Sequence, residues 1–264
     1  IWVHGVLAEV YSLSIALSVA LMYLTDDLRE NRSERRSWLL ALLGGLGVAH
    51  HRLLALLLIP AGLYLLPIAF RSRSFPRWLM IASLCFGAGF LPYLDIPLRI
   101  WLGSTWNYDL ANTWQGFWRV FRGEEVAGLQ RLNLALPALL AAARDVGQVL
   151  VSDLTLPGLV IIGLATARGV WRRQTRPVTW FVVGVGASYA LFALLLRHAV
   201  LLQATLMGAL LALCILLVIG LGSLKTSWQN IGGIVCLGWA VWLGVNNWPF
   251  VISLTRNQNG VAYA

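Results

Sequence analysis

Long apolar runs separated by short polar segments fill most of the sequence. A transmembrane helix needs about 20 consecutive apolar residues, and most of these runs approach that length. The runs expected to cross a membrane are residues 3–24, 38–49, 53–70, 78–101, 154–171, 178–196, 199–222 and 231–248. The pattern therefore predicts an all-α fold, a polytopic transmembrane bundle of about eight membrane helices.

One pair of runs is too short to cross twice. Residues 38–49 and 53–70 meet at the polar triplet His50-His51-Arg52, and arginines flank the pair on both sides. If both flanks are cytoplasmic, the chain must go out and return within this short stretch, whereas two crossings need about 40 apolar residues. The first run, about 12 residues long, reaches only about 18 Å. The hairpin is therefore expected to turn inside the membrane, within a protein-lined or watery cavity.

The composition excludes an ordinary soluble domain. Hydrophobic residues make up 59% of the chain and charged residues 12%, whereas soluble domains carry about 25% charge. The net charge of +9 comes largely from four short segments between the apolar runs: residues 29–36, 71–77, 168–176 and Lys225. Such placement is typical of charge that sets membrane topology, so nucleic acid is not expected as a partner. Eight of the 13 tryptophans lie near expected span ends, as in interfacial belts.

Residues 102–152 are expected to form an outer segment lying in the membrane interface. Asn112 or Thr113 can cap a helix in which aromatic residues recur at helical spacing, namely Trp114, Phe117, Trp118 and Phe121. This amphipathic helix is either a lid that guides lipid or simply an anchor. Residues 134–150, which contain Arg144 and Asp145, predict a second interfacial helix.

The first span carries an acidic residue near its outer end. Glu9, Ser12, Ala16 and Ala20 share one helical face, whose small residues favour close packing on another helix. A glutamate inside a span is costly and usually functional. The alternative is a glutamate at headgroup level, in contact with water.

The span over residues 78–101 ends in a second polar group. Asp95 and Arg99 are four residues apart and can pair on one helical face. Pro97 removes a helical hydrogen bond, which predicts a kink or a helix end there. Arg99 either presents its guanidinium to a phosphate or belongs to an interfacial ion pair.

The polar triplet has two interpretations. His50 and His51 diverge by about 100° on a helix, so they are not expected to chelate one metal ion. Phosphate contact and proton handling suit the two imidazoles and the Arg52 guanidinium, and an interfacial polar turn is the alternative. Three single cysteines in apolar runs, Cys85, Cys214 and Cys236, indicate neither a disulfide framework nor a metal site.

Four segments resemble a known family. They are residues 2–13 (WVHGVLAEVYSL), 47–60 (GVAHHRLLALLLIP), 91–99 (LPYLDIPLR) and 113–118 (TWQGFW). They are similar to the protein O-mannosyltransferase-like membrane family of bacteria, within the GT-C superfamily of polyprenyl-phosphate-sugar glycosyltransferases. Residues 247–264 resemble that family's exit from its last span. Asp95 stands where the family usually has an aromatic residue.

The resemblance implies transfer of a mannose-type sugar from a polyprenyl-phosphate carrier to a protein or glycan acceptor outside a bacterial inner membrane. The donor is a lipid-linked substrate and not a cofactor. Membrane lipid is therefore an expected partner, and no cofactor or metal is expected. Glu9, His50 and His51 are the expected catalytic residues. The expected substrate-binding residues are Tyr11, Arg52, Arg99, Trp106, Asn107 and Trp118.

The resemblance also implies an internal fragment. The family's acidic catalytic motif would precede Ile1, residues 1–248 would form the transmembrane core, and residues 249–264 would begin an extracytoplasmic region. A transporter or flippase of a lipid-linked sugar is the alternative function, although such proteins commonly show inverted repeats that are not visible here. A purely structural membrane subunit is a third, which would leave the polar triplet unexplained.

Overall fold

The computed structural model describes residues 2–69, 75–103, 113–122, 134–195 and 202–256. These residues form helices joined by short turns, and none of them lies in a strand. The helices in chain order are α1 (Trp2–Asn31), α2 (Glu34–His50), the 3₁₀ turn η1 (Arg52–Leu54), α3 (Ala55–Ala69), α4 (Phe75–Ala88), the 3₁₀ turn η2 (Leu91–Leu94), α5 (Asp95–Trp101), α6 (Trp114–Arg122), α8 (Leu136–Leu154), α9 (Leu156–Trp171), α10 (Arg176–Leu195), α11 (Leu202–Gly222) and α12 (Thr226–Arg256). The predicted all-α fold is confirmed.

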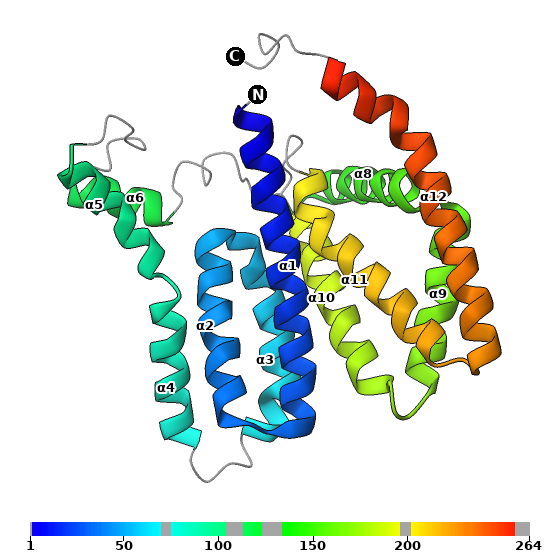
Figure 1. Cartoon of the computed structure of the whole chain (residues 1–264), viewed down its shortest axis with the longest axis horizontal. Helices are drawn as coiled ribbons and strands as arrows, with labels where there is room; N and C mark the ends of the chain where they lie inside the picture. The colour runs from blue at the N-terminus through cyan, green and yellow to red at the C-terminus, as the bar shows by residue number, and fades with distance from the viewer. Residues whose placement is uncertain (1, 70–74, 104–112, 123–133, 196–201, 257–264) are drawn as a thin grey trace.

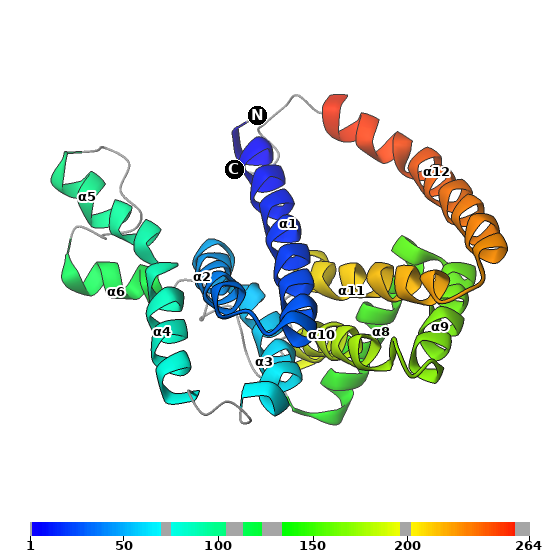
Figure 2. The same cartoon turned by 60° about the horizontal axis from the view of Figure 1, so that its bottom comes forward.

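The bundle has two sides that meet at α1, α3 and α10 (Figures 1 and 2). On one side α2 packs against α4, and α5 and α6 continue from the end of α4; on the other, α8 to α11 pack together and α12 follows α11. The main core lies at the junction. Its fully buried side chains include Leu21 of α1, Leu57 of α3, Val182 and Val185 of α10, and Leu206 of α11.

Three helical stretches are long and apolar enough to cross a membrane: Arg52–Ala69, Phe75–Leu94 and Arg176–Leu195. A fourth results if α8 and α9 count as one span, although the chain bends by 94° between them. The described residues therefore support a membrane protein with three or four such spans, not the eight expected from the sequence. Because of this bend, α8 runs across the end of α9, as Figure 1 shows. The interfacial orientation expected of residues 134–150 stays a prediction.

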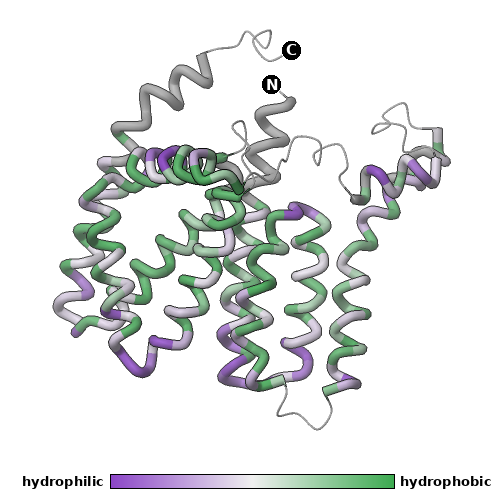
Figure 3. The backbone as a smooth tube through the Cα atoms, turned by 180° about the vertical axis from the view of Figure 1, so that it is seen from behind, coloured by the Kyte–Doolittle hydropathy of each residue, from purple (hydrophilic) through white to green (hydrophobic). Residues whose placement is uncertain are grey.

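Basic residues gather at one end of the bundle, which we call the basic end. The turns after α1, after α9 and after α11 lie there, and α4 begins there (Figure 1). These turns and helix ends carry residues 29–36, Arg77, residues 168–176 and Lys225, and they are hydrophilic in Figure 3. The turn at His50–Arg52 lies at the opposite end. The basic segments that separate the apolar runs in the sequence therefore lie at the same end of the bundle.

Part of the loop expected at residues 25–37 is helical, because α1 continues to Asn31. The Thr25 hydroxyl is buried and donates to the Leu21 carbonyl oxygen at 2.6 Å, so it needs no partner outside the helix. The next residue, Asp26, accepts a 2.7 Å hydrogen bond from the Tyr64 hydroxyl of α3. The Arg29 guanidinium lies over the same ring, 4.3 Å from its centroid. These contacts tie α1 to α3 at the basic end.

The packing face of α1 also differs from the prediction. Ala16 is exposed and Ala20 is only partly buried, whereas Ser14 and Ser18 are buried together with neighbouring leucines. The Ser18 hydroxyl donates to the Ser14 carbonyl oxygen at 2.8 Å. A serine whose hydroxyl is satisfied within its own helix can be buried at little cost, so these positions can face the core in place of the predicted small-residue face.

Two glycines bring α2 and α4 into backbone contact. A Cβ on Gly45 would lie 2.0 Å from the Phe86 carbonyl oxygen, and a Cβ on Gly89 would lie 2.3 Å from the Leu46 nitrogen. The helix breaks at Gly89 and Phe90, immediately after α4. The expected break at Pro97 is therefore wrong: Pro97 lies in the first turn of α5, where its missing N–H is not needed.

Helices α2 and α3 form a hairpin at His50–Arg52, but its first arm is longer than predicted and the stretch Arg52–Ala69 is long enough to cross a membrane. The position of the turn inside the membrane stays a prediction. Helix α2 has 17 residues, about 25 Å at 1.5 Å per residue, because it begins at Glu34. Helix α1 continues well past the turn at His50–Arg52 (Figure 1). The turn therefore lies closer to the basic end than the first residues of α1 do. At the other end of the chain, α12 continues to Arg256, past the boundary expected at residue 249.

Candidate functional site

The polar triplet sends its three side chains to three different places. His50 ends α2 and lines a cavity beside α1 and η2. His51 has an extended backbone and lines a small cavity beside α1, α10 and α11. Arg52 begins η1, and its Nη2 donates to the carbonyl oxygen of Phe121 at 3.0 Å. The structure therefore does not bring the three together in one pocket, and the chemical role of each stays a prediction.

The cavity lined by His50, which we call the polar cavity, has a volume of about 570 Å³. Its apolar wall comes from Leu13 and Leu17 of α1, Leu46 and Ala49 of α2, and Pro92; its polar groups belong to His50, Tyr93 and Asp95. This volume is in the range of small-molecule sites, which are mostly apolar with a few convergent polar groups. An imidazole, a phenol and a carboxyl around one space can donate to and accept from hydroxyl groups, such as those of a sugar.

Two predicted site residues lie on α1 near the polar cavity. Glu9 comes four residues before Leu13, so the two positions share one face of the helix and lie one turn apart. Tyr11 is at a position turned well away from that face. The side chains of Glu9, Tyr11 and Arg99 are outside the part of the structure that is described, and so are Trp106 and Asn107 entirely. Their roles stay predictions.

Helix α6 forms as its sequence predicts, with Thr113 as the capping residue. The Thr113 Oγ1 accepts a 3.0 Å hydrogen bond from the Gly116 N–H, which satisfies one of the free donors of the first turn. At the other end of α6, the Arg52 guanidinium binds the Phe121 carbonyl oxygen. A cation at a helix C-terminus also interacts favourably with the helix dipole. The hairpin turn therefore holds α6 in place.

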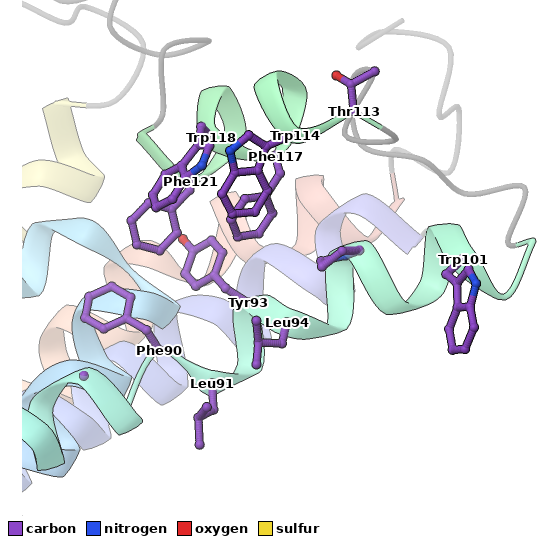
Figure 4. A pocket seen from close by; sticks show the side chains of 12 residues that line it. Phe90, Leu91, Tyr93, Leu94, Trp101, Thr113, Trp114, Phe117, Trp118 and Phe121 are labelled. Carbon is purple, nitrogen blue, oxygen red and sulfur yellow. The ribbon is translucent and has the colours of Figure 1, made fainter.

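A second cavity, which we call the aromatic cavity, lies between α6 and the segment formed by η2 and α5. Its volume is about 600 Å³. Figure 4 shows the rings of α6 directed toward Tyr93 and Phe90. The rings of Tyr93 and Phe121 meet edge to face with centroids 5.1 Å apart, and Trp118 meets Phe121 in the same way at 5.2 Å. Tyr93 lines both cavities, so they adjoin at this residue.

His51 differs from His50 in its surroundings. It faces Ser14 and Ser18 of α1, Tyr189 of α10 and Met207 of α11, around a space of only about 10 Å³. Burial, followed by the charge of His50, holds the pKa of the His51 imidazole below its ordinary value. An imidazole packed among helices around so small a space suits a positioning role better than direct contact with a substrate.

The described residues contain no group of three or more His, Cys, Asp or Glu side chains that could hold a metal ion. The expectation that the site uses no metal stays a prediction.

Asp95 could be identified from the sequence, but Tyr93, two residues before it, was missed as a functional residue. One signal could have found it: Tyr93 follows Pro92 and lies two residues from Asp95. The contact between its ring and that of Phe121 in α6 is visible only in the structure. Only the packing of α2 on α4, however, places Tyr93 next to His50.

Residues 1–75 match the family model described as the protein O-mannosyl-transferase TMEM260 N-terminal domain. No curated protein and no solved structure matches the chain. The matched segment contains α1, the hairpin and therefore Glu9, Tyr11, His50, His51 and Arg52. It supports the resemblance to O-mannosyltransferases, and with the apolar helices it supports a membrane-bound transferase.

Proposed function

We propose that the chain forms the core of a membrane glycosyltransferase of the GT-C kind. It transfers a mannose-type sugar from a polyprenyl-phosphate carrier to a hydroxyl group of a protein or glycan acceptor. In this proposal the basic end faces the cytoplasm of a bacterial cell, the chain spans the inner membrane, and the polar cavity opens on the extracytoplasmic side.

The single observation that carries the proposal is the match of residues 1–75 to an O-mannosyltransferase model. The geometry adds support, because His50 of the matched segment lines a cavity at the end of the bundle opposite the basic segments. That cavity has the size and the polar groups to hold a sugar.

Arginine residues are the proposed partners of the donor phosphate. Sugar transfer breaks the bond between the anomeric carbon and a phosphate oxygen, so negative charge develops on the leaving phosphate. Preorganised donors stabilise such charge, and a guanidinium offers a fork that fits phosphate. Arg52 lies two residues after His50, and Arg99 lies one helical turn after Asp95 on α5. Tyr11, Trp106, Asn107 and Trp118 are further proposed contacts to substrate.

Acidic and imidazole groups are proposed to orient the reactants and handle protons. Glu9, at a position one turn from Leu13, and His50, on the polar cavity, are proposed to act next to the sugar and the acceptor. His51 is proposed to position the turn from behind, because it faces the small cavity.

Sugar transfer by the full-length protein in sealed vesicles tests the proposal, with polyprenyl-phosphate mannose labelled in the sugar. Transfer to an acceptor peptide or glycan is expected, and Arg52→Ala and Arg99→Ala should each reduce the rate by about a hundredfold. Arg173→Ala, at the basic end, is the matched control and should keep the wild-type rate. Movement of the labelled lipid across the membrane without transfer would identify a transporter and refute the enzyme. Normal rates in both arginine variants would refute the phosphate assignment.

A further inference from the structure

We infer that Asp95 is a specificity-determining residue of the polar cavity, where its carboxylate accepts hydrogen bonds from the hydroxyl groups of a neutral sugar ring and disfavours phosphate. The inference rests on the proposed function and deepens it. It gives a role to Asp95, which has none in the proposed mechanism, and it assigns the polar cavity to one part of the substrate.

The backbone holds Asp95 at the wall of the polar cavity. Asp95 follows the 3₁₀ turn η2 and begins α5, and its N–H donates to the carbonyl oxygen of Pro92. Its side chain lines the polar cavity together with His50, which ends α2. Spacing along the chain allowed a pairing of Asp95 with Arg99 on one helical face. The packing of separate helices instead brings a carboxyl and an imidazole to one space.

The lining of the polar cavity matches the two kinds of surface on a sugar ring. A hexose carries C–H groups on its faces and hydroxyl groups around its edge. The apolar wall, which includes Leu13, Leu17 and Leu46, can pack against a C–H face. Both oxygens of a carboxylate accept hydrogen bonds, so Asp95 can receive two neighbouring hydroxyl groups, whereas a neutral imidazole accepts through one nitrogen only. Asp95 is therefore the lining group best suited to recognise sugar hydroxyls.

The charges around the polar cavity argue against phosphate as its occupant. Of the lining residues that the structure describes, one is an aspartate and none is an arginine or lysine. A phosphate in this space would meet the like charge of the Asp95 carboxylate, and such repulsion is stronger away from bulk water. A sugar hydroxyl carries no charge and gains a charge-assisted hydrogen bond from the same carboxylate.

An arginine proposed for the phosphate lies beside the polar cavity and does not line it. The Tyr93 ring, which lines the cavity, meets the Phe121 ring edge to face with centroids 5.1 Å apart. The Phe121 carbonyl oxygen accepts the 3.0 Å hydrogen bond from Arg52. A donor can therefore place its sugar against Asp95 and its phosphate beyond Tyr93, toward Arg52.

Binding of three ligands by the full-length protein in phosphatidylcholine nanodiscs tests the inference without turnover. The ligands are polyprenyl-phosphate mannose, the same lipid with one sugar hydroxyl removed at a time, and polyprenyl phosphate without sugar. In the wild type, loss of a hydroxyl that Asp95 receives should weaken binding by about tenfold to a hundredfold. In Asp95→Ala the intact lipid should lose a similar factor, and that deoxy lipid should bind as well as the intact one. Asp95→Asn keeps one acceptor oxygen and should fall between the two.

Polyprenyl phosphate without sugar separates recognition from a structural effect. It has no sugar hydroxyls, so the wild type and Asp95→Ala should bind it within about threefold of each other. A structural role for Asp95 would instead weaken all three ligands alike. Asp153→Ala is the matched variant, because Asp153 lies on α8 and does not line the polar cavity, and it should leave every affinity unchanged.

The sugar ring can come from the donor or from a glycan acceptor, and methyl mannoside separates the two sources. It stands in for the acceptor sugar and is added, intact or with one hydroxyl removed, while the donor site is saturated. If the donor supplies the ring, Asp95→Ala removes the hydroxyl preference from the lipid series. If the acceptor supplies it, Asp95→Ala removes that preference from the mannoside series only.

The outcomes separate this role of Asp95 from the proposed function. Loss of a hydroxyl preference in Asp95→Ala supports the inference for either source. The same preference in both proteins, or none in the wild type, would overturn it. Tighter binding of the sugar-free lipid to Asp95→Ala, by more than about threefold, would also overturn it by placing phosphate in the cavity. Sugar transfer without the preference would leave the enzyme without this role for Asp95, and the preference without transfer would leave a sugar-binding protein that is not a transferase.

Discussion

The contact between α2 and α4 depends on the absence of a side chain at Gly45. A Cβ there would lie 2.0 Å from the Phe86 carbonyl oxygen and 2.9 Å from its carbonyl carbon. Atoms this close must separate by about 1 Å, and the obstacle is backbone, which cannot rotate away as a flexible side chain could. Overpacking of this kind costs about 1–3 kcal/mol. We place Gly45→Ala near the top of that range.

Gly62→Ala is the matched control, because Gly62 lies in α3 with nothing within 4 Å of an added Cβ. Alanine is favoured over glycine inside a helix by about 0.5–1 kcal/mol, so this variant should be slightly more stable than wild type. The two variants are thus the same substitution with opposite expected signs.

Thermal unfolding in detergent, followed by tryptophan fluorescence, measures the difference. We expect Gly45→Ala to lower Tm by roughly 4–10 °C and Gly62→Ala to leave it equal or raised, since 1 kcal/mol shifts Tm by about 2–4 °C in a chain of this size. Separation of α4 would also move Tyr93 away from His50, so Gly45→Ala should reduce any activity at the polar cavity. A Tm within 1 °C of wild type for Gly45→Ala would refute the close backbone contact.

Three further predictions follow from local contacts. A double-mutant cycle with Tyr64→Phe and Asp26→Asn should give a coupling energy of about 1.5–3 kcal/mol for the hydrogen bond between α1 and α3; a value near zero would show that the contact does not stabilise the fold. Thr113→Ala removes the α6 cap, which costs about 1 kcal/mol and should speed amide exchange of α6 about fivefold, whereas Thr113→Ser should not. After replacement of Cys85, Cys214 and Cys236, Arg173→Cys and Lys225→Cys should react with a membrane-impermeant reagent from the same side of sealed vesicles; reaction from opposite sides would contradict a single basic end.

Local signals in the sequence predict the helices well, because each signal acts within a few residues. Apolar runs locate α2, α3, α9, α10 and α11 to within a few residues of their observed ends. Thr113 and the ring spacing after it predict both the start and the amphipathic character of α6, since a cap hydrogen bond needs only the first turn. The short apolar runs on either side of His50–Arg52 also predict the hairpin.

Contacts between helices were not predictable, because they depend on residues far apart in the chain. The polar cavity forms where Gly45 and Gly89 let α2 and α4 touch, and nothing local to either glycine identifies the other as its partner. The face of α1 was misjudged as well, because its burial is decided by the helices packed against it: Ser14 and Ser18 are buried, whereas Ala16 is exposed. His50 and His51 were treated as one group, although His51 is itself extended at the turn and the two side chains line different cavities.

One hydrogen bond joins the two halves of the candidate site. Arg52 is adjacent to the histidines of the turn, and its guanidinium holds the last turn of α6, the helix that walls the aromatic cavity. A molecule that pushes α6 outward as it enters would therefore pull on the turn through this side chain. Filling one cavity would then move the residues that line the other.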